Sequence, residues 1–186
     1  MTSMSSEVFG LPYGRALTHA DVGAVPDDGH RYELLDGVLI VSPAPRFVHQ
    51  RAVMRLGHLL VAACPPDLEV LAAPFDVVLA EDTVIQPDVL VAPVAAFTET
   101  DLPVAPLLAV EVLSPSTRGV DLLLKKDRLQ RAGGRHYWVV DPDEPSITAW
   151  TLVDGGYRET AHAVGDAAVT VTEPFALTLT PAALVE

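Results

Sequence analysis

Several features that would narrow the class of this protein are missing from its sequence. Cys64 is the one cysteine, so an intramolecular disulfide is excluded and a reduced, cytoplasmic setting is the plain interpretation. No apolar run reaches the roughly eighteen residues that a membrane-spanning helix needs. The stretch MTSMSSEVFGLPYGRAL lacks a basic region followed by an apolar segment, so we expect no signal peptide.

Positive charge is also scarce. Twelve Lys and Arg residues face 25 Asp and Glu residues, giving a formal net charge of −13 at pH 7. This balance argues against nucleic acid, because phosphate contacts need cations. Nine of the twelve basic residues nevertheless fall within residues 46–55 and 118–135. Two interpretations stay open: two helices with ordinary solvated basic faces, or two basic walls around one site.

The composition is that of a globular chain long enough to bury a core. Of 186 residues, 49% are hydrophobic and 20% are charged. No repeat, low-complexity tract or linker divides the chain. We therefore expect a single domain over residues 1–186, with a loose lead-in at 1–17, a core at 31–141 and C-terminal strands at 146–180.

Hydrophobic periodicity and turn residues predict an α+β fold. RYELLDGVLIVSP is typical of a hairpin with an Asp-Gly turn. Helical spacing of His49, Val53, Leu56 and Leu60 predicts a helix. The expected elements are a short helix and turn within 18–30 begun by Thr18, the hairpin 31–43, the helix 45–64, two strands in 68–93, a strand 107–115, a helix 116–134, a strand 135–142, and a hairpin with a final strand in 146–180. The sum is a mixed sheet with a helix on either side.

Two carboxylates interrupt strands that otherwise have the composition of a core. Asp88 lies in TVIQPDVLV and Glu111 lies in PLLAVEVLSPS. An ionised carboxylate in an apolar interior is costly unless it is paired or binds a metal. Pro87 removes a ladder hydrogen bond, at a place where a side chain can be redirected. The pair indicates metal binding or acid–base chemistry, although Asp88 alone has the character of a turn residue.

Helical periodicity selects the lysine that accompanies these acids. Leu122, Leu129 and Ala132 define the inward face of the helix at 116–134. Lys125 lies close to the centre of this stripe, whereas Lys126 lies toward solvent. We expect Lys125 to point at the sheet; the alternative is that its stem only passes along the leucines.

Two further residues are candidates. His49 shares a helix face with Val53 and Leu56, so it points inward, where it could orient a carboxylate or a phosphate; a core histidine is the alternative. Glu33 lies in the first strand of the hairpin, and a solvent-facing glutamate is the alternative there.

The order of acid, acid and lysine, with the first acid after a proline, resembles the PD-(D/E)XK nuclease superfamily. RYELLDGVL, SPAPRFVHQRAV, QPDVLV and VEVLSPSTRGVDLLLKKDRLQRAGGRHYWVVDP together resemble the Uma-two family of putative restriction endonucleases, over roughly residues 15–180. The resemblance implies a restriction-endonuclease-like core at 31–141. It implies Asp88 and Glu111 as metal-binding acids and Glu33 as an upstream acid that completes the site. Leu113 stands where the motif has its lysine, so Lys125 supplies that group instead.

The resulting hypothesis is a Mg²⁺- or Mn²⁺-dependent endonuclease that hydrolyses phosphodiester bonds, with DNA as the expected substrate. Asp88, Glu111 and Glu33 hold the metal, and Lys125 positions or deprotonates the attacking water. Flanking phosphates meet basic side chains of the two helices, namely Arg46, Arg51, Lys126 and Arg128. A homodimer would suit the cutting of two strands. The alternatives are a non-catalytic nucleic-acid- or protein-binding scaffold and a metal-dependent hydrolase of a small phosphoester.

Overall fold

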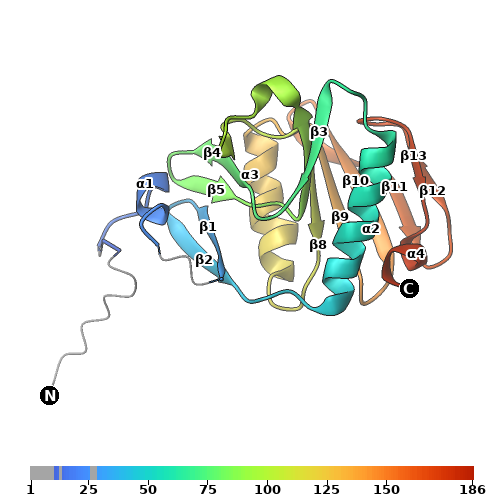
Figure 1. The fold of residues 1–186 in the computed structure, drawn as a ribbon, viewed down its shortest axis with the longest axis horizontal. Coiled ribbons are helices and arrows are strands. Elements are labelled where there is room, and N and C mark those ends of the chain that lie inside the picture. Colours follow the sequence, from blue (N-terminus) through green and yellow to red (C-terminus); the bar gives the residue numbers. More distant parts are fainter. Residues whose placement is uncertain (1–10, 13, 26–28) are drawn as a thin grey trace, which may run out of the picture.

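The computed structural model describes residues 11–12, 14–25 and 29–186. Residues 1–10 and 13 of the expected lead-in, and 26–28 of the expected turn, lie outside the described residues. The described residues form two large β-sheets, one two-stranded sheet and two main helical segments (Figure 1). The predicted α+β class, with a mixed sheet between helices, is confirmed. The single domain over residues 1–186 stays a prediction.

The larger sheet has six strands in the order β11-β10-β9-β8-β6-β3. Its strands are β3 (Leu68–Ala72), β6 (Val89–Pro93), β8 (Leu108–Val112), β9 (His136–Asp141), β10 (Ser146–Val153) and β11 (Gly156–Val164). The β8–β9 pair is parallel and the other pairs are antiparallel. Every residue of β8 is buried, as its nearly continuous apolar sequence predicts for a strand that is covered on both faces.

The second sheet has five strands in the order β2-β1-β5-β4-β7. Its strands are β1 (Arg31–Leu35), β2 (Val38–Ser42), β4 (Asp76–Ala80), β5 (Thr83–Ile85) and β7 (Asp101–Leu102). The predicted β1–β2 hairpin turns at Asp36 and Gly37, whose φ angles are 50° and 74°. A Cβ on Gly37 would lie 2.5 Å from the Cβ of Ala16, so glycine is required there both by space and by conformation.

The two strands predicted in residues 68–93 are in fact four. Pro74 separates β3 from β4, and Pro87 separates β5 from β6. Because proline has no N–H to donate to a ladder, pairing stops at each of them. The chain leaves the larger sheet after β3, forms β4 and β5 in the second sheet, and returns as β6. Asp88 therefore lies where the chain passes between the two sheets.

Helices cover both faces of the larger sheet (Figure 1). One face packs against α2 (Phe47–Ala63), whose buried residues include Val53, Leu56 and Leu60 as predicted. The opposite face packs against the second sheet and against a π-helix, η2 (Val120–Lys125), which continues into α3 (Lys126–Arg131). The helix predicted over 116–134 is confirmed over residues 118–131, although residues 120–125 form π-helical turns, which are wider than α-helical turns.

The remaining elements are short. Helix α1 (His19–Val22) begins after Thr18 as expected, and η1 (Val94–Ala96) precedes β7. The β10–β11 hairpin is as predicted, but the expected final strand is a pair of short strands, β12 (Val169–Val171) and β13 (Leu177–Leu179), followed by α4 (Pro181–Val185). Within the described ranges, no helix combines the length and apolar character that crossing a membrane requires.

The packing of α2 gives a direct test of the fold. Leu56 is fully buried between α2 and the larger sheet, so Leu56→Ala should lower the free energy of unfolding by about 2–5 kcal/mol. Leu123, an exposed leucine of η2, is the matched control, and Leu123→Ala should change it by no more than about 0.5 kcal/mol. Urea denaturation measures both; equal losses would contradict the packing.

Candidate active site

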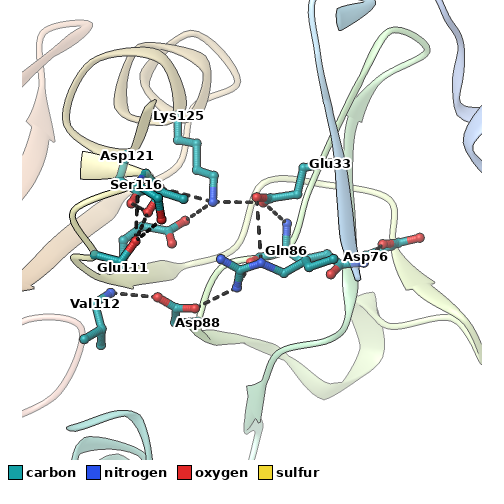
Figure 2. Close-up of polar contacts among 12 residues, drawn as sticks. Glu33, Asp76, Gln86, Asp88, Glu111, Val112, Ser116, Asp121 and Lys125 are labelled. Carbon is teal, nitrogen blue, oxygen red and sulfur yellow. Dashed lines mark hydrogen bonds and ion pairs between the residues drawn. The ribbon is translucent and has the colours of Figure 1, made fainter. Parts of the chain in front are cut away.

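A buried lysine joins three carboxylates between the two sheets. The side chain of Lys125 is 1% exposed. Its Nζ lies 2.9 Å from Glu33 Oε1 and 3.2 Å from Glu111 Oε1. Asp121 Oδ1 is 3.3 Å away, one turn earlier in the same helical segment. Figure 2 shows the ammonium between Glu33 on one side and Glu111 and Asp121 on the other.

These four side chains come from three parts of the fold. Glu111 projects from β8 on the face that also carries Ala109 and Leu113, toward the second sheet. Glu33 is the central residue of β1 in that second sheet. Lys125 and Asp121 belong to η2. The site therefore exists only where two sheets and one helical segment pack together.

Hydrogen bonds fix the helical segment against the larger sheet. The hydroxyl of Tyr137, on β9, donates to the backbone carbonyl of Asp121 at 2.7 Å. The hydroxyl of Thr117 donates to Asp121 Oδ2 at 2.7 Å. These bonds hold the first turn of η2 in place, so the side chains of Asp121 and Lys125 both reach the interior.

Asp88 lies beside this cluster with each of its oxygens bound. Oδ2 accepts the backbone N–H of Val112 at 2.8 Å and lies 3.2 Å from His49 Nε2. Oδ1 accepts from Arg31 Nη1 at 2.7 Å. His49 is buried on the inward face of α2, as its helical spacing predicts, and contacts a carboxylate there.

Burial and neighbouring charges set the pKa values of this cluster. Burial alone would lower the pKa of Lys125, but Glu111, Glu33 and Asp121 raise it above its ordinary value, so the amine stays charged. Burial alone would raise the pKa of Asp88, yet His49, Arg31 and Lys125 lower it to about 2. Burial raises the pKa of Glu111 well above its ordinary value, and Lys125 offsets this only in part.

A cleft of about 780 Å³ opens onto one side of this cluster. Its walls include Arg31, His49 and Asp88, together with Arg46 and the turn around Ser116. Lys125, Glu33 and Glu111 do not line it and lie deeper. A substrate in the cleft therefore meets Asp88 and Arg31 before the remaining acids.

The four basic residues predicted to contact phosphates are not gathered at one surface. Arg46 lines the cleft and pairs with Asp143 at 2.7 Å. The other three lie elsewhere: Arg51 donates to the carbonyls of Val185 and Glu186, Lys126 lies 3.5 Å above the Trp150 ring, and Arg128 pairs with Asp36 and Asp127. Their phosphate contacts stay predictions, and only Arg46 already faces the cleft.

Two residues of the site were missed by the sequence analysis. Asp121 precedes Lys125 by four positions, and this helical spacing was a usable signal. Arg31 opens β1, and its partner Asp88 lies 57 positions away, so no local pattern could link them.

The donor set suits a hard divalent cation. All four acids present carboxylate oxygens, the ligands that Mg²⁺ and Mn²⁺ prefer. Glu111 Oε2 is buried without a hydrogen-bond partner, which leaves a lone pair for a cation. Among the described residues, no three His, Cys, Asp or Glu side chains already form a ligand shell. Arg31 contacts Asp88, and Lys125 contacts Glu33 and Glu111. In chemical type, these donors fit a divalent cation.

Comparison with known proteins indicates a restriction-endonuclease-like protein. The family model described as "Uma2: Putative restriction endonuclease" matches residues 20–183, so the chain belongs to the Uma2 family. A solved structure of a putative nuclease belonging to DUF820, from Anabaena variabilis ATCC 29413, matches with a TM-score of 0.71 and 19% identity. That match covers 91% of this chain and 97% of the other. A search of curated proteins gave no match.

The raised pKa of Glu111 predicts how stability depends on pH. The folded protein keeps the Glu111 proton at pH values where the unfolded chain has released it. Stability should therefore fall as pH rises above the ordinary pKa of glutamate. Glu111→Gln removes this ionisation, so it should raise Tm at pH 7, and by less at pH 5.

Thermal unfolding of the metal-free protein at both pH values measures this effect. Glu99→Gln is the matched control, because Glu99 is exposed in the loop before β7, and its Tm should follow that of the wild type. A Glu111→Gln variant that is less stable than the wild type at both pH values would show that the ionised carboxylate stabilises the fold.

Proposed function

We propose that this protein is a Mg²⁺- or Mn²⁺-dependent endonuclease that hydrolyses phosphodiester bonds in DNA. One observation carries the proposal. A charged, buried lysine contacts three carboxylates, and a fourth carboxylate, that of Asp88, lies beside them and lines a cleft. A buried charge cluster of this kind is costly to keep. Perturbed pKa values in a cleft are typical of catalytic sites. Membership of the Uma2 family supports a nuclease.

Asp88 and Glu111, with Glu33, would hold the metal. A bound divalent ion would polarise the scissile phosphate and lower the pKa of a water ligand. His49 and the Val112 N–H keep Asp88 oriented by binding one of its two oxygens.

Lys125 acts through its positive charge. Because its pKa is raised, it has no free lone pair to accept a proton from water at neutral pH. This makes it a stabiliser of the negative charge that develops on the phosphate in the transition state. Deprotonation of the water by Lys125, the other predicted role, is therefore disfavoured.

A long duplex would receive little attraction from the surface. The net charge is −13, and Arg46, Arg51 and Arg128 already have partners within the chain. Binding to DNA should therefore be weak and should fall steeply with salt. The same observations favour the second candidate, a hydrolase of a small phosphoester. The proposal also includes a cytoplasmic location and a homodimer in which each subunit presents one such site.

The matched lysines of the helical segment test the site. Lys125→Met should reduce metal-dependent cleavage of plasmid DNA by about 100-fold or more, since it removes a charge from the reacting centre. Lys126→Met should lower the rate by less than about tenfold, because Lys126 contacts Trp150 outside the cleft and would contribute at most one phosphate contact. Rates are measured by plasmid nicking with Mn²⁺ and with chelator, and circular dichroism verifies folding.

Asp88→Asn is the second variant, since it keeps the shape of the side chain and should also be inactive. Equal losses in Lys125→Met and Lys126→Met would contradict the assignment of the site. Metal-dependent hydrolysis of bis(p-nitrophenyl) phosphate without DNA cleavage would favour the small-phosphoester hydrolase. If the wild type neither hydrolyses these substrates nor binds metal, the enzyme proposal is contradicted and the non-catalytic binding scaffold is favoured.

A further inference from the structure

Arg31 forms the boundary between the cleft and the acid cluster. Its Nη1 lies 2.7 Å from Asp88 Oδ1, and its Nε lies 3.9 Å from Glu33 Oε2. The Arg31 side chain is 21% exposed, whereas those of Asp88 and Glu33 are 4% and 1% exposed. Arg31 also lines the cleft, which Glu33 does not. Arg31 is thus the one cation of the described cluster that touches both the acids and the space for a substrate.

The contact with Asp88 occupies the oxygen that a metal would need. Oδ2 of Asp88 already accepts from Val112 and lies beside His49, two contacts within the buried core. Oδ1 has Arg31 as its hydrogen-bond partner among the described residues. A cation that approaches Oδ1 therefore competes with the positively charged guanidinium for this oxygen.

The charge balance favours such an exchange. Arg31 and Lys125 supply two positive charges to the carboxylates of Glu33, Asp88 and Asp121, and Glu111 adds a further negative charge when it releases its proton. A divalent ion in place of one guanidinium brings the cluster closer to neutrality. Lys125 is enclosed and cannot leave without unpacking η2. Arg31 borders the adjoining cleft, and its side chain can turn into that space once its contacts with Asp88, Glu33 and the carbonyl of Gln86 break.

We propose that Arg31 takes the place of the divalent cation on Asp88 in the metal-free protein, and that the metal displaces its guanidinium into the cleft, where it binds the substrate phosphate. A planar guanidinium suits a phosphate because it donates two parallel hydrogen bonds. The inference rests on the proposed function for the identity of the phosphate. Arg31 thus competes with the metal for Asp88 in the metal-free protein and contacts the substrate phosphate once the metal is bound.

Calorimetry with Mn²⁺ tests the first half without any cleavage. Arg31→Gln should bind Mn²⁺ at least about tenfold more tightly than the wild type. If Arg31 closes the site in about nine of ten molecules, the apparent affinity for the metal is about tenfold lower than that of the open site. Arg31→Lys keeps the charge and should bind Mn²⁺ more weakly than Arg31→Gln. Arg118→Gln is the matched control: it breaks another Arg–Asp pair, with Asp141, and should leave the affinity unchanged.

Binding of a short single-stranded oligonucleotide tests the second half. With Ca²⁺ in place of Mn²⁺ to limit hydrolysis, Arg31→Gln should bind the oligonucleotide at least about tenfold more weakly than the wild type, and Arg118→Gln should not. Unchanged or weaker Mn²⁺ binding by Arg31→Gln would overturn the inference, as would unchanged oligonucleotide binding. If both expected binding results are obtained but the wild type does not cleave DNA, the proposed nuclease activity is contradicted and the proposed role of Arg31 is still supported.

Discussion

The ammonium group of Lys125 is the interaction on which the interior of this protein depends. It contacts Glu33, Glu111 and Asp121, which are as fully buried as the lysine itself. Without that charge, three acids would face one another in a space that excludes water, at a cost of several kcal/mol. An apolar core of the same volume would fold at least as well. The cluster is therefore better explained by chemistry than by stability.

The architecture is arranged to bring these groups to one point. The six-stranded sheet supplies Glu111, the five-stranded sheet supplies Glu33, and η2 supplies the lysine (Figures 1 and 2). Pro87 ends β5 just before Asp88, where the chain returns to the larger sheet. The same packing that buries the acids also leaves one side open to a cleft, and Asp88 and Arg31 lie where the cluster borders it.

The sequence predicted much of this because isolated charges in apolar strands are conspicuous. Asp88 and Glu111 were identified from their apolar neighbours, and Lys125 was distinguished from Lys126 by helical spacing. The structure buries Lys125 and leaves Lys126 on Trp150. The hairpin at Asp36 was predictable because its turn needs positive φ angles. These are local signals, and each is complete within a few residues.

What the sequence did not predict depends on contacts between distant segments. The strands of residues 68–93 divide between two sheets, and no local pattern distinguishes a break at proline from a bulge. The count of basic residues could not reveal that Arg51 binds the end of the chain or that Arg128 pairs with Asp36. Arg31 was overlooked for the same reason, since its partner comes from another strand.

The central claim is that the acids around Lys125 form a metal site that Arg31 closes. A crystal structure after soaking in Mn²⁺, with data collected at the manganese absorption edge, tests it most directly. The account predicts an anomalous peak within bonding distance of Asp88 and Glu111 and an Arg31 side chain that has left Asp88. A peak at another place, or no peak with the Asp88–Arg31 pair intact at millimolar Mn²⁺, would contradict it.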